Sequence, residues 1–190
     1  MYKKIFCLTL AFSLLCSLAG CGKSGKGLSF DIPAPATGGD LMPGVKALCS
    51  VEDVRAAGVP LQDEPLSEAT DPDSGLPCIT YAVVPPDCTL TIGEHEVYNA
   101  QFHFLDGKLS FVNMKLTEKD DFDALESELT GLYGVSTEAT GAFGTMLMWR
   151  PASDSPVLIQ LSAYMDKDGN HTGSELIVGY IWYDRVGQQP

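Results

Sequence analysis

Basic residues are scarce in this chain, which has 12 Lys and Arg against 25 Asp and Glu and a formal net charge of −13. A protein that binds nucleic acid depends on Lys and Arg to neutralise phosphates. The acidic balance therefore argues against nucleic acid as a partner. The same charge repels an anionic membrane surface, so any membrane attachment has to come from another feature of the chain.

Catalytic motifs are also missing. The three histidines, His95, His103 and His171, are scattered, and they predict no zinc cluster even though Glu94 and Glu96 flank the first of them. No Gly-x-Ser-x-Gly elbow and no Cys-x-x-Cys pair occurs. We therefore expect no enzyme: no catalytic residue, no metal and no cofactor.

No hydrophobic run is long enough to span a bilayer. The apolar stretch 5–15 falls short of the roughly 20 residues that a spanning helix needs. Lys3 and Lys4 precede it, and the segment ends in Leu18-Ala19-Gly20 with two small residues, which completes the three parts of a secretory signal peptide. We predict that residues 1–20 are such a peptide and are removed.

The residues at the expected cleavage site carry a more specific signal. Leu18-Ala19-Gly20-Cys21 resembles the lipobox of bacterial prolipoproteins, and the resemblance covers the first 21 residues. It implies that Cys21 is the lipidation site and becomes the new N-terminus. Two or three acyl chains would then hold the protein on a membrane far more firmly than one. The alternative is a secreted protein in which Cys21 merely follows the cleavage site.

The resemblance also implies a location in the cell envelope. Gly22, not Asp, follows the cysteine, which by the family's sorting rule favours an outer-membrane anchor facing the periplasm, with the cell surface as the alternative. Residues 21–43 are rich in Gly, Ser and Pro and predict a lipidated cysteine followed by a flexible tether. Residues 44–186 form one predicted globular domain, and 187–190 a C-terminal tail. Loss of the signal peptide removes two lysines and no acids, which takes the charge from −13 to −15.

Three cysteines remain in the predicted domain, Cys49, Cys78 and Cys88. An exported chain meets an oxidising compartment, so we expect one disulfide among them. If Pro85-Pro86 turns a hairpin, Cys78 and Cys88 lie too far apart for the usual Cα separation of about 6 Å. This favours Cys49 paired with Cys78 or with Cys88.

Hydrophobic periodicity predicts two helical segments, 45–57 and 118–133. Within the first, Ser50 and Asp53 have the spacing of a capping box. Asp106-Gly107 lies between two β-rich runs and predicts a hairpin turn. Residues 61–76 are expected to be an irregular acidic loop, and the expected strands are 78–84, 88–92, 96–105, 108–116, 142–150, 156–165 and 174–184.

These elements predict an α+β fold in the order α-β4-α-β3, with antiparallel sheet and one or two helices packed on one face. The two predicted helices end in similar residues, which hints at a duplicated helix-plus-sheet unit. The loop 166–170 carries Asp, Asn and Gly, which fits a hairpin turn better than a calcium loop, since His171 and Ile177 stand where an EF-hand has Gly and Glu.

The last predicted strand is apolar on both faces, which places Ile181 and Tyr183 opposite Tyr180 and Trp182. Either another part of the domain covers the second face, or Ile181 and Tyr183 belong to an interaction surface. We expect a non-catalytic envelope lipoprotein, attached to the membrane through Cys21, that binds a protein partner or supports an assembly. The alternative is a binding module for a small ligand or of the inhibitor type, with a pocket.

Overall fold

The computed structural model describes residues 27–32, 40–84, 89–116, 120–141, 144–150 and 157–180. It corrects the predicted fold class, because the chain is mostly β and not α+β with packed helices. Ten strands form one large mixed sheet, and the two helices have only 6 and 14 residues. The element order is β1 Leu28–Phe30, α1 Val51–Ala56, β2 Ser67–Thr70, β3 Pro77–Ala82, β4 Leu90–Ile92, β5 His95–Leu105, β6 Lys108–Leu116, α2 Asp120–Tyr133, β7 Thr137–Gly141, β8 Gly144–Trp149, β9 Val157–Met165 and β10 His171–Tyr180.

The sheet runs in the order β1-β4-β5-β6-β10-β9-β8-β7. The long strand β5 has two partners on its outer edge: β4 pairs with its first residues and β3 with its last ones, and β2 lies outside β3. Only β1 and β4 run parallel; every other pair among the named strands is antiparallel. The run β2-β3-β5-β6 meets the run β7-β8-β9-β10 through the central β6–β10 pair.

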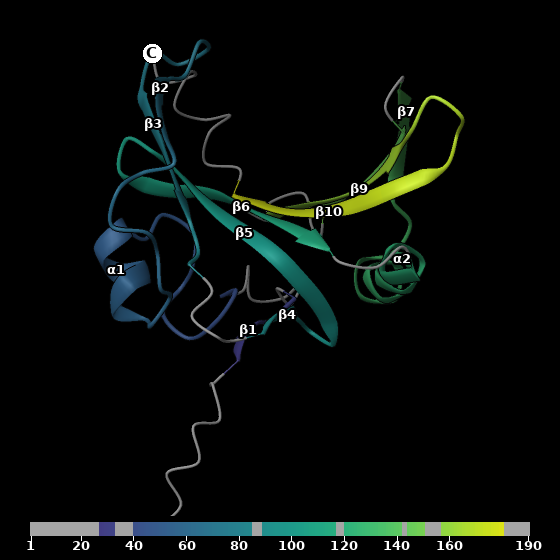
Figure 1. Cartoon of the computed structure of the whole chain (residues 1–190), viewed down its shortest axis with the longest axis horizontal. Helices are drawn as coiled ribbons and strands as arrows, with labels where there is room; N and C mark the ends of the chain where they lie inside the picture. The colour runs from purple at the N-terminus through teal and green to yellow at the C-terminus, as the bar shows by residue number, and fades with distance from the viewer. Residues whose placement is uncertain are drawn as a thin grey trace, which may run out of the picture.

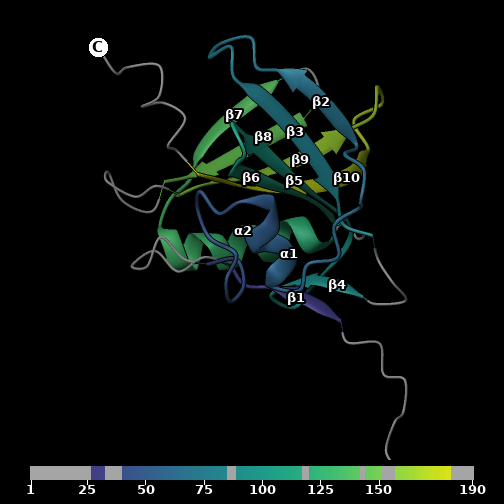
Figure 2. The same ribbon diagram turned by 90° about the vertical axis from the view of Figure 1, so that its left-hand side faces the viewer.

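The sheet is curved into an open trough (Figure 1). Strands β2 and β3 rise on one side and β7 to β9 on the other, while β5, β6 and β10 form the floor. Both helices and the β1–β4 pair lie on the convex side, and the view turned by 90° agrees (Figure 2). Sheets twist because of backbone chirality, and a sheet of this many strands readily curls.

Two polar edge strands explain most of the difference from the predicted order. β2 lies inside the predicted acidic loop, and all four of its side chains are exposed, so it has no apolar alternation to detect. β7 follows α2 after a short turn and precedes β8, where one strand was expected over 142–150. Both read Glu-Ala-Thr, at Glu68 to Thr70 and Glu138 to Thr140. Backbone pairing with β3 and β8 holds them in the sheet.

β1 is the third strand that was not predicted. It lies inside the segment 21–43 that composition describes as a tether, yet Phe30 is fully buried and its ring contacts that of Phe102 at 6.0 Å between centroids. One large aromatic side chain therefore builds part of that segment into the core.

Several local signals are confirmed. Ser50 and Asp53 form a reciprocal capping box at the start of α1, which begins at Val51, so the predicted segment 45–57 shrinks to its second half. Asp106 and Gly107 both have positive φ, 49° and 73°, as a tight hairpin between β5 and β6 requires. Helix α2 buries Leu125 and Leu129.

The core lies between the convex side of the sheet and the helices. Its largest fully buried side chains come from strands, loops and α2 alike: Trp149, Phe30, Phe102, Phe104, Leu41, Ile92, Leu109, Met114, Leu116, Leu125, Leu129 and Ile159. The indole Nε1–H of Trp149 donates to the carbonyl of Gly134, which ties the end of α2 to β8. One face of the sheet is thus used for stability, and the other lines the trough.

Candidate functional site

The trough side of the sheet is the candidate functional site. Side chains alternate along a strand, so residues between the core positions of β5 point into the trough. Phe102 and Phe104 are buried in the core, which places His103 on the trough side, as the alternation predicts. Register then aligns Thr80, His103 and Phe111 across β3, β5 and β6. Next to them lie Gln101 and Asn113, which are also Cα partners.

His103 is held in a fixed orientation. Its Nδ1 lies 2.9 Å from the hydroxyl of Thr80, and its ring stacks on that of Phe111, with centroids 3.9 Å apart and planes at 16°. Burial lowers the pKa of His103 to about 4, and the negative charge of Glu175 opposes this shift in part. The imidazole is therefore neutral near pH 7. With the Thr80 hydroxyl as donor to Nδ1, the ring proton is on Nε2.

Five buried side-chain polar atoms have no hydrogen-bond partner in the described part of the chain: the hydroxyls of Tyr133 and Tyr180, and three atoms on the trough side of β5 and β6. The three on the trough side are His103 Nε2, Asn99 Oδ1 and Asn113 Oδ1. An unpaired buried polar atom costs about 1–3 kcal/mol relative to one that is satisfied. Three of them on one face, all outside the core, are typical of a surface that completes its hydrogen bonds with something else.

Glu175 lies on the same face of the sheet and is buried, although it carries an acidic group. Its carboxylate accepts a hydrogen bond from the Tyr164 hydroxyl. Burial, and then this hydrogen bond, raise the pKa of Tyr164 to about 12, so the phenol keeps its proton and remains the donor. Lys115 is the Cα partner of Glu175 on β6. The trough therefore contains fixed polar and charged groups, not a uniformly solvated surface.

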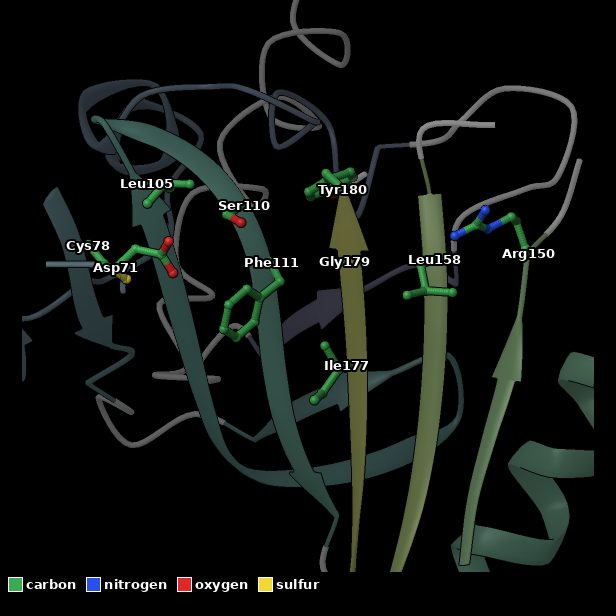
Figure 3. Close-up of a pocket in the computed structure, with 10 residues that line it drawn as sticks. All are labelled: Asp71, Cys78, Leu105, Ser110, Phe111, Arg150, Leu158, Ile177, Gly179 and Tyr180. Atoms are coloured by element: carbon green, nitrogen blue, oxygen red, sulfur yellow. The ribbon is translucent and has the colours of Figure 1, made fainter. Parts of the chain in front are cut away.

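One end of the trough forms an apolar pocket with a volume of about 430 Å³ (Figure 3). Its lining residues are Asp71, Cys78, Leu105, Ser110, Phe111, Arg150, Leu158, Ile177, Gly179 and Tyr180. Asp71 and Arg150 extend inward from opposite sides, with Leu158, Ile177 and Phe111 between them. This volume is in the range of small-ligand and anchor-residue pockets.

A second polar cluster joins β5 to α2 on the convex side. His95 Nδ1 lies 3.0 Å from Asp121 Oδ1, and its Nε2 lies 3.3 Å from Glu128 Oε2. Both ring nitrogens are thus engaged by carboxylates that fasten the helix to the sheet. Among the described residues, no group of three or more His, Cys, Asp or Glu side chains is arranged to hold a metal ion.

The cysteine predictions divide between described and undescribed residues. Cys49 is buried and Cys78 half-buried, and both are free thiols, so the structure does not support a bond between them. Burial is the main cause that raises the pKa of each thiol. The lipidation site Cys21 and the third candidate for a disulfide, Cys88, lie outside the described residues.

The predicted interaction residues Ile181 and Tyr183 also lie outside the described residues. Further back on that strand, Leu176, Val178 and Tyr180 are buried on one face, and Ile177 is half-buried on the other, where it lines the pocket. The loop 166–170 is a hairpin turn: the Asp166 carboxylate accepts from the backbone N–H groups of Asp168 and Asn170.

Alternation along the predicted strand 96–105 puts Asn99, Gln101 and His103 on one face, and their polar side chains indicate a solvated face. The curvature of the sheet makes it a half-buried trough instead. Arg150 and Gly179 were not singled out, because neither belongs to a motif. A signal was present in the sequence: apolar residues on both faces of the last strand.

Within the described part of the chain, neither helix is long and apolar enough to cross a membrane. Comparison with protein-family models, with curated proteins and with solved structures finds no match.

Proposed function

We propose that this chain is a lipid-anchored envelope protein, attached through Cys21, whose trough binds another protein. The observation that carries the proposal is the row of buried polar atoms without partners on the trough side, at Asn99, His103 and Asn113. Unpaired buried polar atoms lower the stability of a protein, so the three on the trough side favour a partner that supplies the missing hydrogen bonds.

The dimensions of the trough favour a protein over a small molecule. Eight strands spaced roughly 4.8 Å apart give a surface roughly 30 Å across along the sheet, which is the scale of a protein interface. The surface also mixes aromatic, amide and charged groups, including Phe111, Tyr164, Lys115 and Glu175. Aromatic residues are enriched at protein interfaces.

Site-specific photocrosslinking in cells tests this proposal. A benzoylphenylalanine placed at Gln101, in the trough, should give one discrete protein adduct. The same group at Ser127, an exposed position of α2 on the convex side, should give none. The adduct partner, once identified and purified, should rebind the full chain with saturable affinity. No adduct from Gln101, a lipid adduct, or the same adducts from both positions would contradict the proposal.

A further inference from the structure

We propose that the pocket at the end of the trough is the anchor site for an extended peptide segment of the partner, and that it takes an apolar side chain with an acidic residue beside it. This inference rests on the proposed function and narrows it to a ligand class. It is carried by the apolar floor, the charges on either side of it, and the unpaired polar atoms that continue from it along β5 and β6.

The floor is apolar on the face where a sheet normally shows polar residues. A sheet with one packed face alternates apolar and polar side chains, so its second face is expected to be polar. Here Leu158, Ile177 and Phe111 occupy adjacent strands β9, β10 and β6 on the second face, and all three are half-buried. A well-packed apolar pocket is the usual place for an interface anchor residue.

Gly179 leaves the middle of this floor open. It lies on β10 between Phe111 of β6 and Leu158 of β9. A Cβ atom at this position would be 3.6 Å from the Leu158 carbonyl oxygen and 3.9 Å from the Phe111 Cβ, both ordinary contacts. The backbone therefore does not require glycine there, and the missing side chain is space that a ligand can use.

The charges at the two sides give the ligand a direction. Arg150 is exposed, lies on the β8 side, and forms no ion pair with any described residue. Asp71 lies on the opposite side and accepts hydrogen bonds from the backbone of Asp73 and Ser74 in its own turn. A carboxylate is attracted at Arg150 and repelled at Asp71, so the acidic group of the ligand lies beside the apolar one on the β8 side.

The unpaired polar atoms identify the ligand as a peptide and not a fatty acid. Asn113 follows Phe111 by two residues on β6, so the apolar pocket and the polar floor lie roughly 7 Å apart along the strand. Peptide groups offer both a donor and an acceptor, which can satisfy Asn99, Asn113 and His103 Nε2 together. An acyl chain supplies neither and would leave all three atoms buried and unpaired.

Matched peptides test the pocket directly. The probes are capped peptides with the core Leu-Phe-Glu, Leu-Phe-Gln or Leu-Phe-Lys between Gly-Ser flanks, titrated calorimetrically against the full chain in detergent, with empty micelles as the blank. We expect the Glu peptide to bind roughly tenfold more tightly than the Gln peptide, because a charge-assisted pair with Arg150 is lost, and the Lys peptide to bind least. Arg150→Glu should reverse the order of the Glu and Lys peptides.

A filled-pocket variant supplies the second arm. Gly179→Leu should abolish binding of all three peptides, while Gly173→Ala, on the same strand with no atom within 4 Å of a new Cβ, should leave binding unchanged. Circular dichroism melting establishes that both variants fold. Equal affinity for the three peptides, unchanged binding by Gly179→Leu, or tighter binding of 4-phenylbutyrate than of the Glu peptide would overturn the inference.

The outcome for this pocket is separable from the outcome for the trough. If the crosslink from Gln101 persists in the Gly179→Leu variant, the partner binds the trough without this anchor and only the pocket assignment fails. If Gln101 gives no crosslink in the unaltered chain, the proposed function itself fails.

Discussion

His103 shows how much one residue of this site depends on the fold. Its position on the face opposite Phe102 and Phe104 follows from alternation along a strand and could be predicted from the sequence. Its stacking on Phe111 and its hydrogen bond to Thr80 could not, because both come from register with strands that lie elsewhere in the chain. The buried, unpaired Nε2 depends on the curvature of the whole sheet.

The neutral state of His103 predicts a pH dependence of stability. Its pKa is about 4 in the folded chain against an ordinary value of 6.5, so between these values the unfolded state binds a proton that the folded state does not. The free energy of unfolding should therefore fall as pH drops from 6.5 to 4, by at most about 3 kcal/mol from this group. Urea unfolding at pH 7 and pH 4.5 measures the drop.

The control for this dependence is His103→Gln, which keeps a polar side chain but has no group that titrates in this range. Carboxylates elsewhere contribute equally to both proteins, so the difference between them isolates the histidine. An identical pH dependence in the two proteins would show that His103 has the same pKa in the folded and the unfolded chain.

At the level of elements, the sequence predicts those whose formation depends on local chemistry. The capping box at Ser50, the turn at Asp106-Gly107 and the apolar stripe of α2 were all found from spacing alone. β2 and β7 were missed because their side chains carry no alternating pattern. They are strands because the backbones of β3 and β8 are available to pair with them. Local patterns thus predict too few strands, and the fold class inferred from those strands is wrong.

Two Gly→Ala substitutions give a matched test of how closely the backbone is packed at the start of β8 and in α2. Gly144, at the start of β8, has a φ of 134°, and a Cβ there would lie 1.8 Å from the Ala163 carbonyl oxygen. Gly144→Ala should destabilise the chain by about 2–3 kcal/mol, since the β8–β9 pair has to move apart. Gly131→Ala, in α2 with no atom within 4 Å of the new Cβ, should stabilise it by about 0.5–1 kcal/mol.

Chemical denaturation of the two alanine variants beside the unaltered chain provides the measurement. The opposite signs are the informative result, because both variants add the same methyl group. If Gly144→Ala were as stable as the unaltered chain, the close approach of β8 to β9 would not exist in solution.

At the level of the whole molecule, the arrangement of the sheet predicts which side faces the membrane if the proposed lipid anchor is present. β1 lies on the convex side, away from the opening of the trough (Figure 1). Gly27, where the described chain begins, follows Cys21 by six residues, which even fully extended reach roughly 20 Å. If Cys21 carries the proposed lipid, the β1 side is held close to the membrane, and the trough opens toward the surrounding compartment, where the proposed protein partner can reach it.

Fluorescence quenching on vesicles tests this orientation. Ser29→Cys on β1 and Ser67→Cys on β2, both exposed positions, can carry the same fluorophore in a background with Cys78→Ser and Cys88→Ser, which leaves the buried Cys49 as the one other thiol in residues 44–186. On vesicles that contain spin-labelled lipid, the label at Ser29 should be quenched several-fold more than the label at Ser67, because quenching needs close contact with the lipid.

Adding Cys21→Ser should abolish quenching at both positions, since the acidic chain has no other attraction to the bilayer. Equal quenching at the two positions would mean that the trough does not open away from the membrane. Quenching that survives Cys21→Ser would instead contradict the lipid anchor and leave the fold and the trough untouched.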